Sequence, residues 1–198
     1  STSEIYGDPE IHPQHEDYWG KVNPIGVRAC YDEGKRCSET LFFDYWGQYQ
    51  LSIKIKRIFN TYGPKQSTDF VMSKFIRAAL KDEDITIYGD GSQSRTFCYI
   101  DDNSEACINA MTSDQFVNEI FNIGNDIIVT IKELAEIVIK LTHSSSKIVY
   151  LPPLEDGDMT RRQPDITKMK ALLNRDLTPM EEGIKKVIEA IKTNQVED

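Results

Sequence analysis

The sequence predicts an α/β fold, because helix-like and strand-like segments follow one another along the chain. Residues 51–59 alternate apolar and polar side chains, as a half-buried strand does, and they lead into a Gly-Pro turn at 60–64. Residues 28–50 read as a long helix. Shorter strands are expected at 85–88, 120–124 and 147–151, and further helices at 69–80, 101–111, 130–141 and 183–192.

Local signals refine three of these segments. Residues 1–6 are expected to be the end of a parallel strand, and residues 7–26 form a long irregular stretch of the kind that often carries function. Asp101 or Asp102 is expected to cap the helix at 101–111. Thr130 and Glu133 have the spacing of a capping box, which predicts that the next helix begins there.

Composition excludes some classes of function. The chain has 198 residues, a net charge of −9, and ordinary hydrophobic and charged contents of 39% and 28%. The net negative charge disfavours general nucleic-acid binding, which needs a basic surface, and no apolar run approaches the length of a membrane span. The cysteines have no C-x-x-C spacing, so no metal site is expected, and we expect free buried thiols in a reducing compartment: Cys30, Cys37, Cys98 and Cys107.

Tyr31 and Lys35 form the most informative pair. On a helix their spacing places both on one face, with Cβ atoms about 6 Å apart. An ammonium about 5 Å from a phenol, at an effective dielectric near 20, favours the phenolate by roughly 3 kcal/mol. Tyr31 could therefore act as an acid/base, although the same spacing also arises on solvated helix faces.

Several segments together carry a resemblance. The chain contains Thr2-Ser3-Glu4, Tyr6-Gly7-Asp8-Pro9, Val22-Asn23-Pro24-Ile25-Gly26, Tyr31-Asp32-Glu33-Gly34-Lys35-Arg36, Asn60-Thr61-Tyr62-Gly63-Pro64 and Pro164-Asp165-Ile166. This set resembles the extended short-chain dehydrogenase/reductases that modify sugar nucleotides, and within them the UDP-glucuronate decarboxylases. The resemblance runs from residue 1 to about residue 188.

The resemblance implies NAD as cofactor, a UDP-sugar as substrate and a homodimer built on the helix at 28–50. Tyr31, Lys35 and Thr61 would contact the cofactor, and Asn60, Arg95 and Arg162 the substrate. Tyr31, Lys35, Thr2, Ser3, Glu4 and Arg162 would be catalytic. Arg95 and Arg162 could instead be ordinary surface arginines, and 60–64 a plain turn.

Ser3 distinguishes two reactions. Related dehydratases have Asp at this position, where it protonates a leaving hydroxide, and a serine cannot do this. The resemblance therefore implies oxidation at C4, loss of carbon dioxide and return of the hydride. A 4,6-dehydratase, a 4-epimerase and a non-catalytic remnant that binds a sugar nucleotide or a subunit remain as alternatives.

Two departures from the family lie near the expected ligands. Residues 65–70 are shorter by about two residues and lack arginines that the family commonly has there. Lys74 stands where the family often has Asn. Both changes leave open how tightly ligands are held.

The implied fold is the C-terminal part of a doubly wound Rossmann-type parallel sheet with a smaller α+β substrate-binding lobe. Residues 1–64 and 96–143 would belong to the Rossmann-type domain, and 65–95 and 144–198 to the lobe. No G-x-G-x-x-G turn is present, so we expect an upstream NAD-binding half. The cytoplasm is the expected compartment, or the Golgi lumen if an upstream anchor exists.

Overall fold

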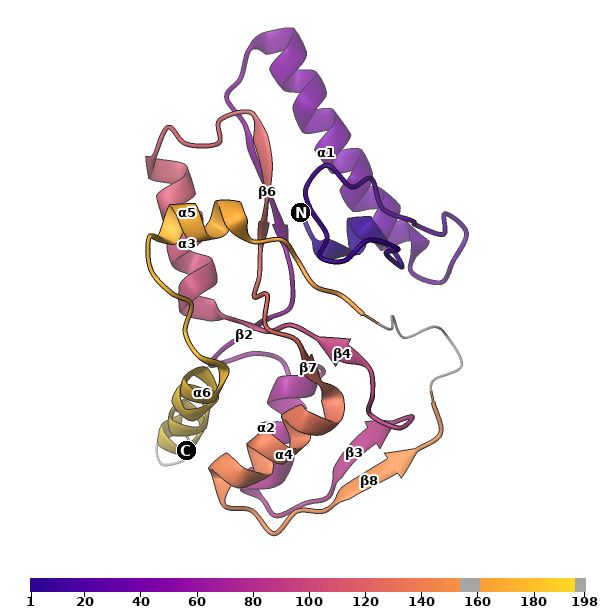
Figure 1. The fold of residues 1–198 in the computed structure, drawn as a ribbon, viewed down its shortest axis with the longest axis vertical. Coiled ribbons are helices and arrows are strands. Elements are labelled where there is room, and N and C mark those ends of the chain that lie inside the picture. Colours follow the sequence, from indigo (N-terminus) through magenta and orange to yellow (C-terminus); the bar gives the residue numbers. More distant parts are fainter. Residues whose placement is uncertain (154–160, 195–198) are drawn as a thin grey trace.

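The structure, a computed structural model, describes residues 1–153 and 161–194 (Figure 1). Its helices are the 3-10 helix η1 (Ser3–Tyr6) and the α-helices α1 (Ala29–Tyr49), α2 (Val71–Leu80), α3 (Ile100–Thr112), α4 (Ile131–Thr142), α5 (Thr167–Leu173) and α6 (Met180–Asn194). Its strands are β1 (Lys54–Ile58), β2 (Thr61–Tyr62), β3 (Ile85–Tyr88), β4 (Ser94–Arg95), β5 (Cys98–Tyr99), β6 (Glu119–Ile123), β7 (Val129–Thr130) and β8 (Ile148–Leu151). The α/β fold is confirmed.

Parallel strand pairs dominate the described residues. β1 pairs with β6 in parallel, from Lys54 opposite Glu119 to Ile58 opposite Ile123. β2 pairs with β5 and β3 with β8, also in parallel, whereas β4 and β7 are antiparallel. Because consecutive parallel strands need crossovers, helices lie between them. Ligands of such sheets bind at the carboxyl ends of the strands, where β1 continues into residues 59–62.

Two apolar cores stabilise the two ends of the molecule. One fills the space among α2, α4, α6 and β3, in the lower part of Figure 1. The other lies among α3, α5 and β6, in the upper part of the figure. Ile5, Tyr6 and Phe59 form a smaller cluster that seats η1 against the end of β1.

The first six residues differ from the prediction. Thr2 makes only a single parallel bridge with Ile58, and η1 follows immediately. Thr2 caps this helix, since its Oγ1 accepts from the Glu4 amide at 3.4 Å. A threonine in extended conformation before a short turn favours a cap over continued strand pairing. The predicted strand end was therefore wrong beyond Thr2.

The capping box at Thr130 is confirmed, but the predicted cap at Asp101 or Asp102 was wrong. Thr130 Oγ1 accepts from the Glu133 amide, and Glu133 accepts from the Thr130 amide. α3 instead starts after Tyr99, without a side-chain cap. The carboxylate of Asp102 is fully buried and accepts from the backbone and side chain of Thr178, so a tertiary contact displaced the local one.

The cysteines are all free, but their burial was predicted only in part. Cys98 is buried and Cys107 half-buried, whereas Cys30 and Cys37 are exposed on α1. Much of α1 faces away from the rest of the chain, and only Asp32 and Glu39 on it are buried. Within the described residues, no helix combines the length and the apolar character that crossing a membrane requires.

Candidate functional site

Arg162 and Glu4 form the centre of the candidate site. Nη1 of Arg162 donates to Glu4 Oε1, and Nη2 donates to Glu4 Oε2 at 3.3 Å. Nη1 also donates to the buried Ser3 hydroxyl at 3.2 Å. The side chains of Arg162 and Glu4 are only 6% and 15% exposed. This burial contradicts the alternative of a surface arginine at position 162.

Backbone pairing around Gln14 positions Arg162. The Gln14 amide donates to the Gln163 carbonyl at 2.8 Å, and the Asp165 amide donates to the Gln14 carbonyl at 2.8 Å. The Gln14 side chain is fully buried and accepts from the Gln163 amide. The loop at 7–26 therefore holds the segment that carries Arg162. The segment His12-Pro13-Gln14 is also part of the resemblance to the family, but sequence reasoning assigned no role to Gln14.

The arginines around Glu4 keep its carboxyl group ionised. Burial raises the pKa of Glu4, but the hydrogen bond and charge of Arg162, followed by Arg28 and Arg95, outweigh burial and lower it overall. Nη2 of Arg28 lies 3.3 Å from Glu4 Oε2. Glu4 is therefore held as a carboxylate between arginines.

Asp32 is a buried neighbour of this cluster that sequence reasoning missed. It is 7% exposed, and its Oδ1 has no hydrogen-bond partner among the described residues. Burial and the negative charge of Glu4 raise the pKa of Asp32, against the opposing charges of Arg28 and Arg162. Since Asp32 directly follows Tyr31, the first turn of α1 borders the Glu4–Arg162 pair.

Tyr31 and Lys35 lie on one face of α1. The Lys35 ammonium lies 5.6 Å from the centroid of the Tyr31 ring, and Tyr31 is 45% exposed. Within residues 1–153 and 161–194, neither the Tyr31 hydroxyl nor the Lys35 ammonium makes a hydrogen bond or an ion pair. Both groups are therefore available to a ligand.

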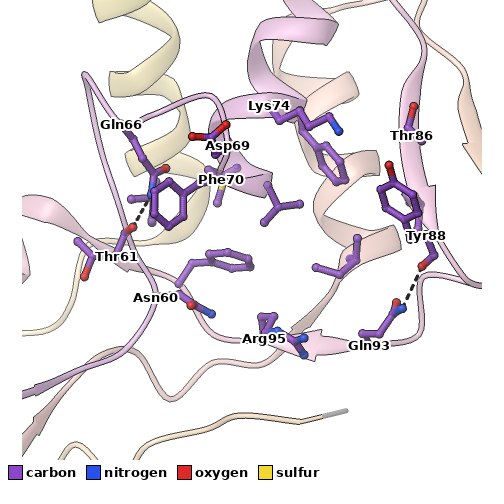
Figure 2. Close-up of a pocket in the computed structure, with 17 residues that line it drawn as sticks. Asn60, Thr61, Gln66, Asp69, Phe70, Lys74, Thr86, Tyr88, Gln93 and Arg95 are labelled. Atoms are coloured by element: carbon purple, nitrogen blue, oxygen red, sulfur yellow. Dashed lines mark hydrogen bonds between the residues drawn. The ribbon is translucent and has the colours of Figure 1, made fainter. Parts of the chain in front are cut away.

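A pocket of about 410 Å³ contains three of the other predicted residues, Asn60, Thr61 and Arg95 (Figure 2). Three hydrogen bonds fix the position of Thr61. Its hydroxyl donates to the Phe59 carbonyl at 3.1 Å and accepts from Asn103 Nδ2 at 2.8 Å. Gln66 Nε2 donates to the Thr61 carbonyl at 2.7 Å. Sequence reasoning did not identify Asn103 or Gln66.

Arg95 connects the pocket with the Glu4–Arg162 pair. It lines the pocket from β4, and its charge contributes to the lowered pKa of Glu4. Ser94, the other residue of β4, forms a parallel bridge with Arg161. The structure therefore brings a pocket and a buried carboxylate–guanidinium pair together at one end of the parallel strands.

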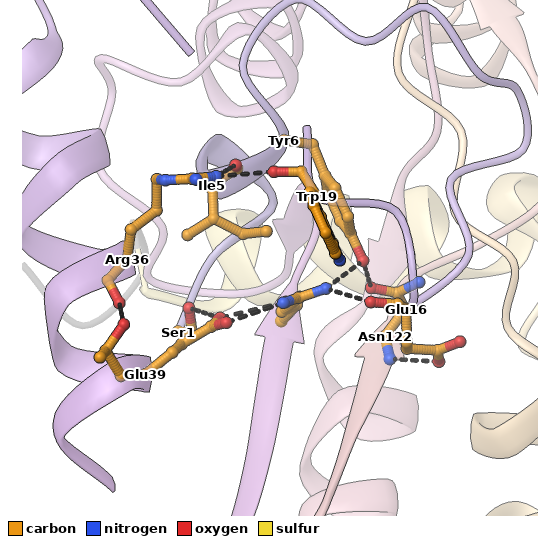
Figure 3. Close-up of polar contacts among 10 residues, drawn as sticks. Ser1, Ile5, Tyr6, Glu16, Trp19, Arg36, Glu39 and Asn122 are labelled. Atoms are coloured by element: carbon orange, nitrogen blue, oxygen red, sulfur yellow. Dashed lines mark hydrogen bonds and ion pairs between the residues drawn. The ribbon is translucent and has the colours of Figure 1, made fainter. Parts of the chain in front are cut away.

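A buried polar network fixes the N-terminal residues of the site (Figure 3). Arg57 on β1 donates to Glu39 on α1, with Nη2 2.8 Å from Oε2, and to the Tyr6 hydroxyl at 2.9 Å. Tyr6 donates to Asn122 Oδ1 on β6 at 2.8 Å, and Ser1 Oγ donates to Glu39 Oε1 at 2.5 Å. The network joins β1, β6, α1 and η1, so it positions the residues next to it.

The part of the chain that the structure describes contains no candidate metal centre. No group of three or more His, Cys, Asp or Glu side chains there is placed to hold a metal ion.

Curated proteins resemble this chain over most of its length. UDP-glucuronic acid decarboxylase 1 of Danio rerio is 47% identical over 96% of this chain and 45% of its own length. UDP-glucuronic acid decarboxylase 5 of Arabidopsis thaliana is 50% identical over 87% of this chain and 50% of its own length. The chain thus spans about half the length of the curated relatives that it matches.

Solved structures agree on the fold. The UDP-glucose 4-epimerase of Thermotoga maritima with UDP-glucose superposes with a TM-score of 0.88 at 28% identity, over 98% of this chain and 62% of that one. The UDP-glucuronic acid 4-epimerase of Bacillus cereus with UDP-glucuronic acid and NAD has a TM-score of 0.85 at 28% identity, over 98% and 60%. The Rossmann-type fold is therefore confirmed. The sequence pattern of one family matches residues 1–124, and on these grounds the chain belongs to the NAD dependent epimerase/dehydratase family.

Proposed function

We propose that this chain carries the substrate-facing part of an NAD-dependent UDP-glucuronate decarboxylase. The observation that carries the proposal is the forked pairing of Arg162 with a carboxylate, Glu4, beside Ser3. The planar guanidinium of Arg162 binds the Glu4 carboxylate through both of its Nη atoms. The same geometry suits the carboxylate of a glucuronate ring. Relatives at 47–50% identity bear the name UDP-glucuronic acid decarboxylase, which supports this assignment.

Oxidation at C4 requires a base for its hydroxyl proton, and we assign this role to Tyr31. The Lys35 ammonium lies beside the Tyr31 ring, and the Thr2 hydroxyl serves as a second hydrogen-bond partner of the C4 oxygen. In the described residues the Tyr31 hydroxyl and the Lys35 ammonium make no hydrogen bond or ion pair, so both would be free to hold NAD, and Thr61 would contact it as well. When bound, NAD accepts the hydride from C4 and later returns it.

Decarboxylation follows because a ketone at C4 makes the sugar acid a β-keto acid. The C5–carboxylate bond breaks, its electron pair forms the enolate, and carbon dioxide leaves. Arg162 orients the carboxylate before the bond breaks, and the Ser3 hydroxyl lies beside it to stabilise the enolate. Glu4 is a carboxylate while it pairs with Arg162; once released from that pair it takes up a proton from solvent and delivers it to C5. For this, Glu4 exchanges its place on Arg162 with the substrate.

The nucleotide occupies the pocket in this proposal, with contacts from Asn60 and Arg95. Residues 1–64 and 96–143 form the Rossmann-type domain, and 65–95 and 144–198 the substrate lobe. The pairing of β1 with β6 and of β3 with β8 supports this division, whereas the packing of α4 with α2, α6 and β3 favours placing 131–142 in the substrate lobe. Residues 154–160 and 195–198 lie outside the described residues.

A 4-epimerase is the second candidate, and the solved 4-epimerases at 28% identity favour it. An epimerase needs no residue that assists loss of the carboxylate, whereas this chain buries Arg162 against Glu4. A dehydratase is less suited, because Ser3 cannot protonate a leaving hydroxide. The non-catalytic alternative predicts binding without turnover.

We also propose a homodimer formed through α1. Leu41, Tyr45 and Tyr49 follow one another at helical spacing and are 52%, 53% and 63% exposed. Together with Phe42, they form an apolar face that a second copy of α1 can cover. Light scattering after size exclusion tests this, and a monomer at micromolar concentrations contradicts it.

We propose the cytoplasm as the compartment, supported by the four free cysteines. The Golgi lumen is the alternative compartment. Fluorescence microscopy of the protein carrying a fluorescent tag distinguishes the two compartments.

The deciding experiment supplies UDP-glucuronate and NAD, and identifies the product by mass spectrometry. One arm uses the chain itself, and the other the chain joined behind the amino-terminal half of the Danio rerio relative. The joined protein is expected to form UDP-xylose, and its Tyr31→Phe variant to lose at least about 100-fold in kcat. UDP-galacturonate as the product contradicts the proposal, and full turnover by Tyr31→Phe contradicts the acid/base assignment.

A further inference from the structure

The pocket in Figure 2 contains a second cation that the proposed reaction has not used. Lys74 lines the pocket from α2, and its ammonium lies 5.9 Å from the centroid of the Tyr88 ring on β3. In the described residues, no carboxylate lies within 4.0 Å of this ammonium. Asp69, the acidic residue that lines the pocket, accepts a hydrogen bond from Ser67 at 2.8 Å.

The composition of the pocket fits a nucleoside diphosphate better than a neutral ligand. Aromatic side chains supply apolar walls for a base: Phe70, Phe75, Tyr88 and Phe97. Lys74 and Arg95 supply positive charge from α2 and β4, at different sides of the view in Figure 2. A diphosphate carries more negative charge than one guanidinium neutralises, so a second cation adds binding energy.

The two cations are held differently. Arg95 donates to the Ser94 carbonyl at 2.8 Å, and its charge also acts on Glu4. Among the described residues, the Lys74 ammonium contacts only the face of the Tyr88 ring, a weak interaction at an exposed site. Its long side chain is therefore free to turn from the ring to a phosphate.

We infer that Lys74 is a phosphate-binding residue of this pocket and sets its preference for the diphosphate over the bare nucleoside. The inference rests on the proposed function, because it takes the sugar nucleotide as the ligand.

The test titrates the chain with UDP, UMP and uridine in a calorimeter, without NAD. Lys74→Asn is expected to weaken UDP about tenfold, UMP less, and uridine not at all. Lys74→Arg keeps most of the affinity because the charge remains. Lys81→Asn is the matched control, since it removes the same charge from the exposed end of α2 outside the pocket and leaves UDP binding unchanged. Added salt weakens UDP binding less in Lys74→Asn than in the unchanged chain.

The contradicting results are equally specific. Equal UDP affinity in Lys74→Asn overturns the inference, as does an equal loss for UDP and uridine, which would indicate a change in pocket shape. Absence of UDP binding to the chain also overturns it and leaves the decarboxylase assay standing. If another nucleoside diphosphate binds with the same dependence on Lys74, the inference stands and the proposed substrate falls.

Discussion

Arg162 and Glu4, which are 158 residues apart in the chain, form a buried forked ion pair that joins η1 to the segment following β8. Its burial predicts a role in stability, and in the proposed function the same guanidinium binds the substrate carboxylate. These two roles can be separated by measurement.

Removing Arg162 should destabilise the chain. Arg162→Met leaves the buried Glu4 without its forked partner and with only the weaker charge effects of Arg28 and Arg95 among the described residues, so we expect a loss of about 3 kcal/mol in the free energy of unfolding. Adding Glu4→Met should restore most of this loss, because no uncompensated charge then remains buried. Urea unfolding measures both. Arg161→Met is the control, since that side chain is exposed, and a loss equal to that of Arg162→Met would refute the account.

Acid should weaken the same pair. The pKa of Glu4 in the folded chain lies below its ordinary value, so in that pH range the unfolded chain binds more protons. Glu4 therefore contributes stability at neutral pH that is lost as the pH falls through the folded pKa. The urea midpoint of the unchanged chain should fall more steeply toward about pH 3 than that of Glu4→Gln. Parallel curves would contradict the assignment.

Asp32 should behave in the opposite way. Its folded pKa is raised, first by burial and then by Glu4, so its contribution is present at low pH and lost as the pH rises through the folded pKa. Asp32→Asn should therefore gain stability relative to the unchanged chain at neutral pH and lose that gain in acid. Asp82→Asn is the contrast, because hydrogen bonds from Ser145 and Ser144 lower the pKa of Asp82. A destabilised Asp32→Asn at neutral pH would show that the charged form is required.

Glu39 should matter for stability although it lies outside the pocket. Glu39→Ala leaves the buried guanidinium of Arg57 without its carboxylate, so a loss of about 3 kcal/mol is expected. Glu33→Ala, which removes an exposed partner 3.7 Å from Arg36, should change stability by less than about 0.5 kcal/mol. Equal effects in urea unfolding would mean that the network in Figure 3 carries no special weight.

The sequence predicted elements whose signals are local. The strand predicted at 51–59 contains β1, and the helix predicted at 28–50 contains α1. The capping box of Thr130 and Glu133 marks the start of α4. The sequence did not predict α5, and it assigned Asp102 to a cap because its true partner, Thr178, is distant in the chain. Local patterns do not encode such tertiary competition.

The candidate site also contains one relation that local spacing predicts and several that depend on tertiary contacts. Tyr31 and Lys35 could be paired from their spacing, because one helical turn fixes their relation. The pairing of Arg162 with Glu4, the burial of Gln14 and the hold of Asn103 on Thr61 join segments far apart in sequence. No sequence spacing predicts contacts between segments that lie so far apart in the chain.

The central claim concerns the fate of the sugar carboxylate beside Arg162. UDP-glucuronate labelled with ¹³C at that carboxyl group tests it, when supplied with NAD to the chain joined to the amino-terminal half of its Danio rerio relative. The account predicts one labelled carbon dioxide for each UDP-pentose formed, and loss of both in Arg162→Met. Label that stays in a UDP-uronic acid of unchanged mass would contradict it.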